Sequence, residues 1–229
     1  MRHPCRALRV LLLSFLAGCV TEGAPKPESP QKIAEAHTKL GVLYYQKGQL
    51  DVALDELDEA LKADAGSVHA LSALALVRER LGEYDEAENA FRRARELDPV
   101  YSENRTNYGV FLCGRGRIKE AIGEFQAAAS NPLYAEAQKA LFNAGQCLMN
   151  HGDPASARSW LEKALAKDPQ MPEALLAFAQ AAYAAGDYGK AEEALDRYHA
   201  LRLPDASSIA LSRKIAQSKR GFRVIAPRE

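Results

Sequence analysis

Four cysteines and five histidines are the side chains of this chain best suited to covalent or metal chemistry. Cys5 and Cys19 lie near the N-terminus, whereas Cys113 and Cys147 lie far inside the chain. The histidines are scattered, and no His-x-x-x-His or Cys-x-x-Cys spacing typical of zinc sites occurs. Without a Gly-x-Ser-x-Gly elbow or a phosphate-binding loop, the chain is not expected to be an enzyme. We expect no metal, no cofactor and no small-molecule substrate.

The elements that position these side chains recur along the chain with a period of 34 residues, the spacing that separates Leu40, Leu74 and Tyr108. Small residues follow at one fixed offset: Ala53, Ala87, Ala121, Ala157 and Ala191. Glycines expected in turns also share one position of the repeat: Gly48, Gly82, Gly116, Gly152 and Gly186. This spacing is typical of tetratricopeptide (TPR) repeats, in which small residues stand where two helices cross closely. The fold class expected is all-α, a right-handed superhelical solenoid of about five helix hairpins plus a C-terminal capping helix.

The 34-residue period sets the expected boundaries of the repeats. The repeats are expected at residues 34–67, 68–101, 102–137, 138–171 and 172–205, with a partial sixth at 206–217 and a basic tail at 218–229. The whole solenoid is thus expected at 34–217. The third repeat is two residues longer than the standard length, and the surplus falls around Asn131–Tyr134.

The N-terminus reads as an export signal. Arginines precede a short apolar stretch in residues 1–18, which is far shorter than the ~20 residues that span a bilayer. Leu-Ala-Gly-Cys at residues 16–19 resembles the bacterial lipobox, so Cys19 is the expected lipidation site, and residues 19–33 are expected to form a flexible tether. The expected location is the periplasmic side of the outer membrane.

The net charge of the exported chain argues against nucleic acid as a partner. Removing the three arginines of the signal leaves 27 basic against 30 acidic residues, a net charge of −3.

A protein-binding groove is expected along the first helix of each repeat. In the TPR register its residues are Val42, Tyr45, Leu76, Val110, Phe142, Met149, Leu176 and Tyr183. These side chains would suit an apolar segment of a partner protein. The alternative is that some of them fill the core between repeats.

Cys113 and Cys147 lie on the first helices of adjacent repeats. An even pair of cysteines in an exported chain is consistent with a disulfide, which requires Cα atoms within ~7 Å. Two small buried hydrophobic residues are the alternative.

Three segments resemble the PilF/PilW family of type IV pilus biogenesis and stability lipoproteins. They are Asn107–Cys113, Asn131–Tyr134 and Asn143–Cys147, and the order of lipobox, short linker and TPR array agrees over nearly the whole chain. The resemblance implies an outer-membrane lipoprotein, a pilotin, that helps the pilus secretin subunit to localise or multimerise. It also implies a complete sixth repeat, whereas this chain is expected to carry only its first helix. The alternative function is a TPR outer-membrane lipoprotein that scaffolds cell-wall hydrolases or synthases.

Overall fold

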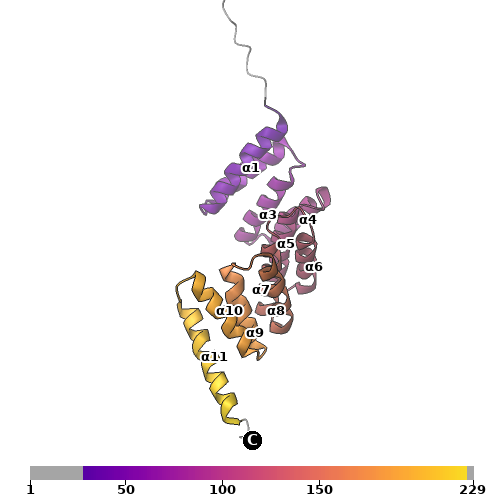
Figure 1. Cartoon of the computed structure of the whole chain (residues 1–229). Coiled ribbons are helices and arrows are strands. Elements are labelled where there is room, and N and C mark those ends of the chain that lie inside the picture. Colours follow the sequence, from indigo (N-terminus) through magenta and orange to yellow (C-terminus); the bar gives the residue numbers. More distant parts are fainter. Residues whose placement is uncertain (1–27, 226–229) are drawn as a thin grey trace, which may run out of the picture.

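The computed structural model describes residues 28–225, with side chains through Arg220, and this range contains eleven α-helices and no strand. Successive helices pair as hairpins, α1 with α2 and so on to α9 with α10, and α11 follows alone (Figure 1). The expected signal segment and Cys19 lie outside the described residues. The helix bounds are α1 Pro30–Gln46, α2 Leu50–Ala63, α3 Val68–Leu81, α4 Tyr84–Leu97, α5 Ser102–Gly114, α6 Ile118–Ala129, α7 Ala137–Asn150, α8 Pro154–Lys167, α9 Pro172–Ala184, α10 Tyr188–Leu201 and α11 Ala206–Ile225.

The turn inside each hairpin depends on a glycine in a left-handed conformation. All five turn glycines have a positive φ, between 74° and 81°, which other residues rarely adopt. The five residues are those expected from the sequence: Gly48, Gly82, Gly116, Gly152 and Gly186. The expected all-α TPR architecture is therefore confirmed.

The two helices of a hairpin cross where the sequence places its smallest residues. A Cβ atom added to Gly41 or Gly145 would lie 2.6 Å from Cγ of Leu57 or Leu161 on the opposite helix. Such a separation is far below van der Waals contact, so these crossings admit only glycine without rearrangement. The expectation that small residues mark close helix crossings is confirmed.

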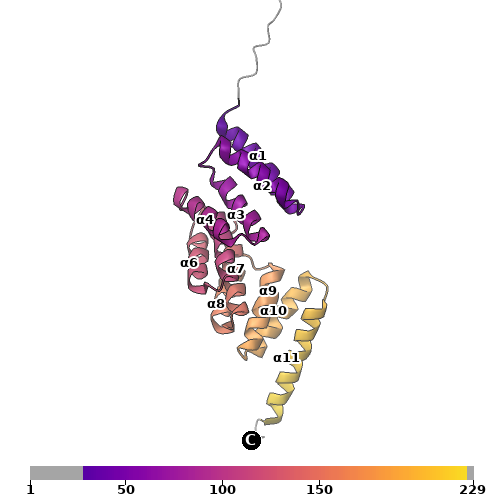
Figure 2. The same cartoon turned by 180° about the vertical axis from the view of Figure 1, so that it is seen from behind.

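The odd-numbered helices form a continuous inner row. The backbone of each lies close to that of the next, from α1 and α3 through to α9 and α11, whereas within residues 28–225 the even-numbered helices touch one another only through side chains. The hairpins therefore stack with the odd-numbered helices closer together, and the array is an elongated arc with α1 and α11 at opposite ends (Figures 1 and 2). This is the solenoid geometry in which one surface is concave.

Two expected boundaries differ from the structure. Helix α1 begins at Pro30, so residues 30–33 belong to the solenoid and not to the tether. The hydroxyl of Ser29 accepts a hydrogen bond from the Lys32 amide at 3.3 Å, and proline at the first helical position suits a helix start. At the other end, α11 continues to Ile225, so the supposed tail is helical from residue 218 to residue 225. Lys219 pairs with Glu192 of α10, which holds this end of α11 against the array.

The irregular connection between the third and fourth repeats lies where the sequence has its surplus. Residues 130–136 join α6 to α7, a longer connection than the other inter-repeat turns such as 98–101. Asn131 holds it: its side-chain amide donates to the Val100 carbonyl at 3.1 Å and to Ser102 Oγ at 2.9 Å. Its Oδ1 accepts the Leu133 amide at 3.0 Å. The extra residues therefore form an anchored turn.

Within residues 28–225, no helix combines the length and the apolar character needed to cross a membrane.

Candidate partner-binding surface

The eight residues expected to line a groove all lie on the inner row of helices. Seven of them are half-buried and pack against the core clusters, while Val110 is 46 % exposed. The two alternatives, groove and inter-repeat core, therefore both describe these side chains in part. They occupy α1 (Val42, Tyr45), α3 (Leu76), α5 (Val110), α7 (Phe142, Met149) and α9 (Leu176, Tyr183).

The N-terminal part of the inner row carries the expected residues Val42 and Tyr45. The guanidinium of Arg80 on α3 lies 5.3 Å from the centre of the Tyr45 ring, which orients the ring by a cation–π contact. Leu40 and Leu43, on the opposite face of the same helix, are 40 % and 42 % exposed. These two leucines are not part of the groove expected from the sequence.

A hollow of about 250 Å³ opens between α5 and α7. Val110 is the expected groove residue at its edge, and the disulfide and Phe125 form part of its wall. No lysine, arginine or acid lines it, so it would suit an uncharged segment of a partner. Its polar lining residues are Asn143, Gln146, Asn150 and His151. Asn143, Gln146 and Asn150 recur on one face of α7, a pattern that is visible in the sequence.

A second hollow lies between α7, α9 and α11. It contains the expected residues Met149 and Tyr183, together with Leu211 and Lys214 of α11. The Tyr183 ring packs on Tyr188 with centroids 5.5 Å apart. The structure therefore brings Met149 and Tyr183 together, whereas Val110 belongs to the other hollow.

Cys113 on α5 and Cys147 on α7 are joined by a disulfide, with Cα atoms 5.9 Å apart. Both side chains are buried. The bond links the third repeat to the fourth at the wall of the α5–α7 hollow.

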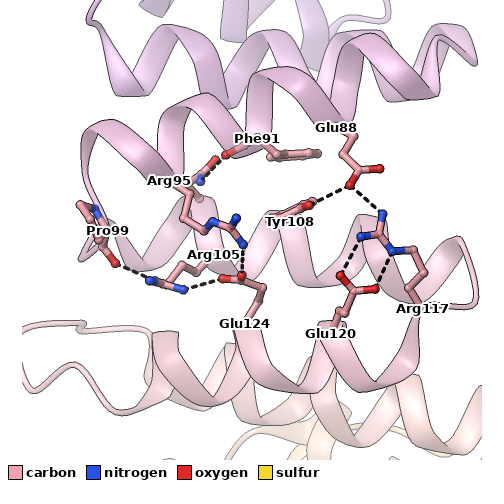
Figure 3. A network of polar contacts seen from close by, with 10 residues as sticks. Glu88, Phe91, Arg95, Pro99, Arg105, Tyr108, Arg117, Glu120 and Glu124 are labelled. Atoms are coloured by element: carbon pink, nitrogen blue, oxygen red, sulfur yellow. Dashed lines mark hydrogen bonds and ion pairs between the residues drawn. The ribbon is translucent and has the colours of Figure 1, made fainter.

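A polar network on the second and third repeats supports this part of the inner row (Figure 3). Glu124 of α6, only 8 % exposed, accepts hydrogen bonds from Arg95 of α4 at 2.7 Å and Arg105 of α5 at 2.6 Å. Arg105 also donates to the Pro99 carbonyl at 2.7 Å. One buried carboxylate thus connects three helices, and two guanidinium groups more than compensate its charge.

The second half of the network involves Tyr108, a residue of the Asn107–Cys113 segment. Its hydroxyl donates to Glu88 of α4 at 3.1 Å, and Arg117 donates to the same carboxylate at 2.7 Å and to Glu120 at 2.8 Å and 2.7 Å (Figure 3). Burial, and then the Glu88 charge, raises the pKa of Tyr108 to about 12, while the Arg117 hydrogen bond lowers the pKa of Glu88. Tyr108 is therefore a neutral donor that orients α5.

Comparison with known proteins agrees with this architecture. Family models described as tetratricopeptide repeat match residues 31–68 and 112–172, residues 68–99 and residues 148–211. A curated protein, the type IV pilus assembly protein PilF of Pseudomonas aeruginosa, is 30 % identical over 217 residues, which cover 93 % of this chain and 86 % of PilF.

Two solved structures extend the similarity to three dimensions. One, from the functional characterisation of Pseudomonas aeruginosa PilF, has a TM-score of 0.76 at 27 % identity and covers 86 % of this chain and 88 % of its own. The other is PilW, described as a widely conserved type IV pilus biogenesis factor, with a TM-score of 0.74 at 29 % identity and coverage of 84 % and 88 %. The resemblance read from the three sequence segments is thereby confirmed, and the chain belongs to the PilF/PilW family of TPR proteins of type IV pilus biogenesis.

Proposed function

We propose that this protein is an outer-membrane lipoprotein adaptor that binds a pilus secretin subunit and promotes its localisation and multimerisation. Membership of the PilF/PilW family supports the link to pilus biogenesis. A TPR solenoid supplies a binding surface built from rigid helices and needs no catalytic group for this role.

The membrane anchor is proposed from the sequence. Leu-Ala-Gly-Cys at residues 16–19 would make Cys19 the lipidated residue, and the Pro- and Glu-rich stretch that follows would separate the lipid from α1. Val20, in place of an aspartate, suits sorting to the outer membrane. Several acyl chains at ~0.8 kcal/mol per buried methylene would hold the adaptor stably. Anchoring would raise the local concentration of bound secretin subunits and so favour ring assembly without catalysis.

The observation that carries the binding proposal is the apolar surface on α1 and α3. Val42 and Tyr45 share one face of α1 and are half-buried, and half-buried Leu76 follows on the adjacent inner helix. A tyrosine that is partly exposed on a rigid support is a typical anchor of protein interfaces. We infer that this surface, continued by Val110 and Phe142, receives an apolar segment of the secretin subunit.

The test replaces Tyr45 and Leu76 with glutamate in the full-length protein. Because each new carboxylate would be desolvated at the interface, secretin binding should weaken at least about tenfold, and fewer secretin multimers should form in cells. Helicity should not change, because both side chains reach solvent.

A matched control places the same charges on the outer helices. Val52→Glu and Leu97→Glu alter side chains of α2 and α4 that are 39 % and 47 % exposed, and should leave binding and multimerisation unchanged. Normal secretin multimers in the Tyr45/Leu76 variant would show that the inner surface of the first repeats is not the binding site.

A further inference from the structure

Three side chains with metal-binding atoms meet at the junction of the third and fourth repeats. Cys147 and His151 are four residues apart at the end of α7, so they lie on one side of the helix axis, and Cys113 comes from the neighbouring inner helix α5. The ligand atoms of the three residues all lie within 4.8 Å of one another. The zinc spacings sought in the sequence did not include this arrangement, because one ligand comes from a different repeat.

We propose that, when the Cys113–Cys147 bond is reduced, the two cysteine sulfurs and the His151 imidazole bind a thiophilic d¹⁰ cation, with Zn²⁺ as the representative ion. Thiolate and imidazole are the ligands that Zn²⁺ prefers. Bond lengths of ~2.3 Å to sulfur and ~2.1 Å to nitrogen in a tetrahedral site place neighbouring ligand atoms roughly 3.6–3.8 Å apart. Cys113 Sγ already lies 3.9 Å from His151 Nδ1.

The histidine must change its hydrogen bonding to take this role. In the disulfide form its Nδ1 lies 2.8 Å from the Cys147 carbonyl oxygen, as is common at a helix end. The residue is exposed, so its ring can turn toward the sulfurs at little packing cost. Binding through Nδ1 would replace that hydrogen bond with a metal bond and leave Nε2–H to face solvent.

The surroundings permit a fourth ligand and do not repel a cation. The three residues line the α5–α7 hollow, which is open to water and has no lysine or arginine in its lining. Asn150, Asn143 and Gln146 lie in the same hollow and can hydrogen-bond a metal-bound water. Two thiolates and a neutral imidazole would balance the charge of Zn²⁺.

Disulfide and metal are alternative links between the same two helices. Reduction by a phosphine with one water converts the disulfide into two thiols and the phosphine into its oxide. Zn²⁺ then displaces one proton from each thiol. Oxidation by a disulfide oxidant removes two electrons and releases the metal. The α5–α7 junction is therefore held in both redox states, by a covalent bond or by a cation.

The first experiment measures Zn²⁺ binding to the purified chain with a chromogenic chelator as competitor. Protein reduced with a phosphine should bind one Zn²⁺ per chain, and oxidised protein should bind none at this site. Co²⁺ added to the reduced protein should give a thiolate-to-cobalt charge-transfer band. Equal Zn²⁺ binding by reduced and oxidised protein would overturn the proposal.

The second experiment assigns the ligands. His151→Ala should weaken Zn²⁺ binding by more than about tenfold, because loss of a ligand should cost at least as much as loss of a group that merely orients one. The oxidised His151→Ala protein should lose little of the wild-type Tm, because the ring is exposed and only its hydrogen bond to the Cys147 carbonyl is removed. His69→Ala removes an exposed histidine outside the cluster and should bind Zn²⁺ as the wild type does. Undiminished binding by His151→Ala would likewise overturn the three-ligand site.

Discussion

At the scale of single residues, Gly109 has almost no space beside it. A Cβ atom at this position would lie 2.7 Å from Cε1 and 2.9 Å from Cδ1 of Phe125, a ring with no exposed surface. Gly109→Val should therefore lower the free energy of unfolding by about 3 kcal/mol, as overpacking of a rigid core does. Urea denaturation followed by circular dichroism measures the change.

Gly123 provides the matched control for that substitution. It also lies inside a helix, α6, but a Cβ atom added there meets nothing within 4 Å. Gly123→Val should change the free energy of unfolding by less than about 0.5 kcal/mol, because the surface is open and valine is slightly the better helix former. Equal effects at the two glycines would mean that the helix crossing does not select glycine.

The sequence predicted the positions of single residues where one local rule decides them. The five turn glycines are examples, because a positive φ excludes most other side chains. The site residues were less predictable. Repeat position identified Val110 and Tyr183 as inner-row residues, but their separation into two hollows depends on packing between repeats, which no local pattern encodes. His151 was missed because its neighbour Cys113 is close only in three dimensions.

At the scale of helices, α11 is held at its start by Asp205. The carboxylate accepts hydrogen bonds from the hydroxyls of Ser207 and Tyr198 and from the Ser208 amide, and these bonds hold its pKa below the ordinary value. Tyr198 stands where the other repeats have alanine, and its contact with Asp205 explains this departure from the pattern. The docking of the last helix therefore depends on an ionised aspartate.

Protonation of Asp205 should weaken that docking. Because the pKa is lower in the folded state, the carboxylate stabilises the protein above the ordinary aspartate pKa of about 4, and this contribution is lost as the pH falls toward the folded-state pKa. Asp205→Asn keeps an acceptor for the helix start but cannot ionise. The Tm of the wild type should exceed that of the variant at neutral pH, and the difference should shrink below about pH 4.

Asp196→Asn serves as the control, because this exposed aspartate of α10 has no hydrogen bond among the described side chains. Its Tm difference from the wild type should be small at every pH. A Tm difference for Asp205→Asn that does not vary with pH would exclude ionisation as the source of its effect.

The ends of the array were the elements least predictable from the sequence. Interior helices have neighbours on both sides and repeat a pattern, so their starts at Val68, Ser102 and Pro172 agree with the expected register. The first and last helices lack one neighbour, and their lengths depend on caps and single contacts. The Ser29 cap and the Lys219–Glu192 pair extend α1 and α11 beyond the expected limits.

At the scale of the whole molecule, the stability of the solenoid depends on the junctions between its repeats. Each hairpin contacts only its neighbours, so stability is close to a sum of repeat and interface contributions. The junction of the third and fourth repeats has the longest connection, at residues 130–136, and it alone among the described junctions carries a disulfide. The covalent bond therefore reinforces the point where the repeat pattern is interrupted.

Reduction of this bond in the presence of a metal chelator should loosen the array at that junction. For a loop of 34 residues, the entropy gained by the unfolded chain corresponds to a loss of about 3–4 kcal/mol of stability. Hydrogen exchange should accelerate first in α5 and α7, because their contact is the one released, while α1 and α9 should keep more of their protection. A Cys113→Ala/Cys147→Ala variant should show the same exchange with and without reductant. In an array held by nearest-neighbour contacts, the effect should be confined to the broken interface. If reduction instead accelerates exchange equally along residues 28–225, the repeats unfold as a single unit and the junction has no special role.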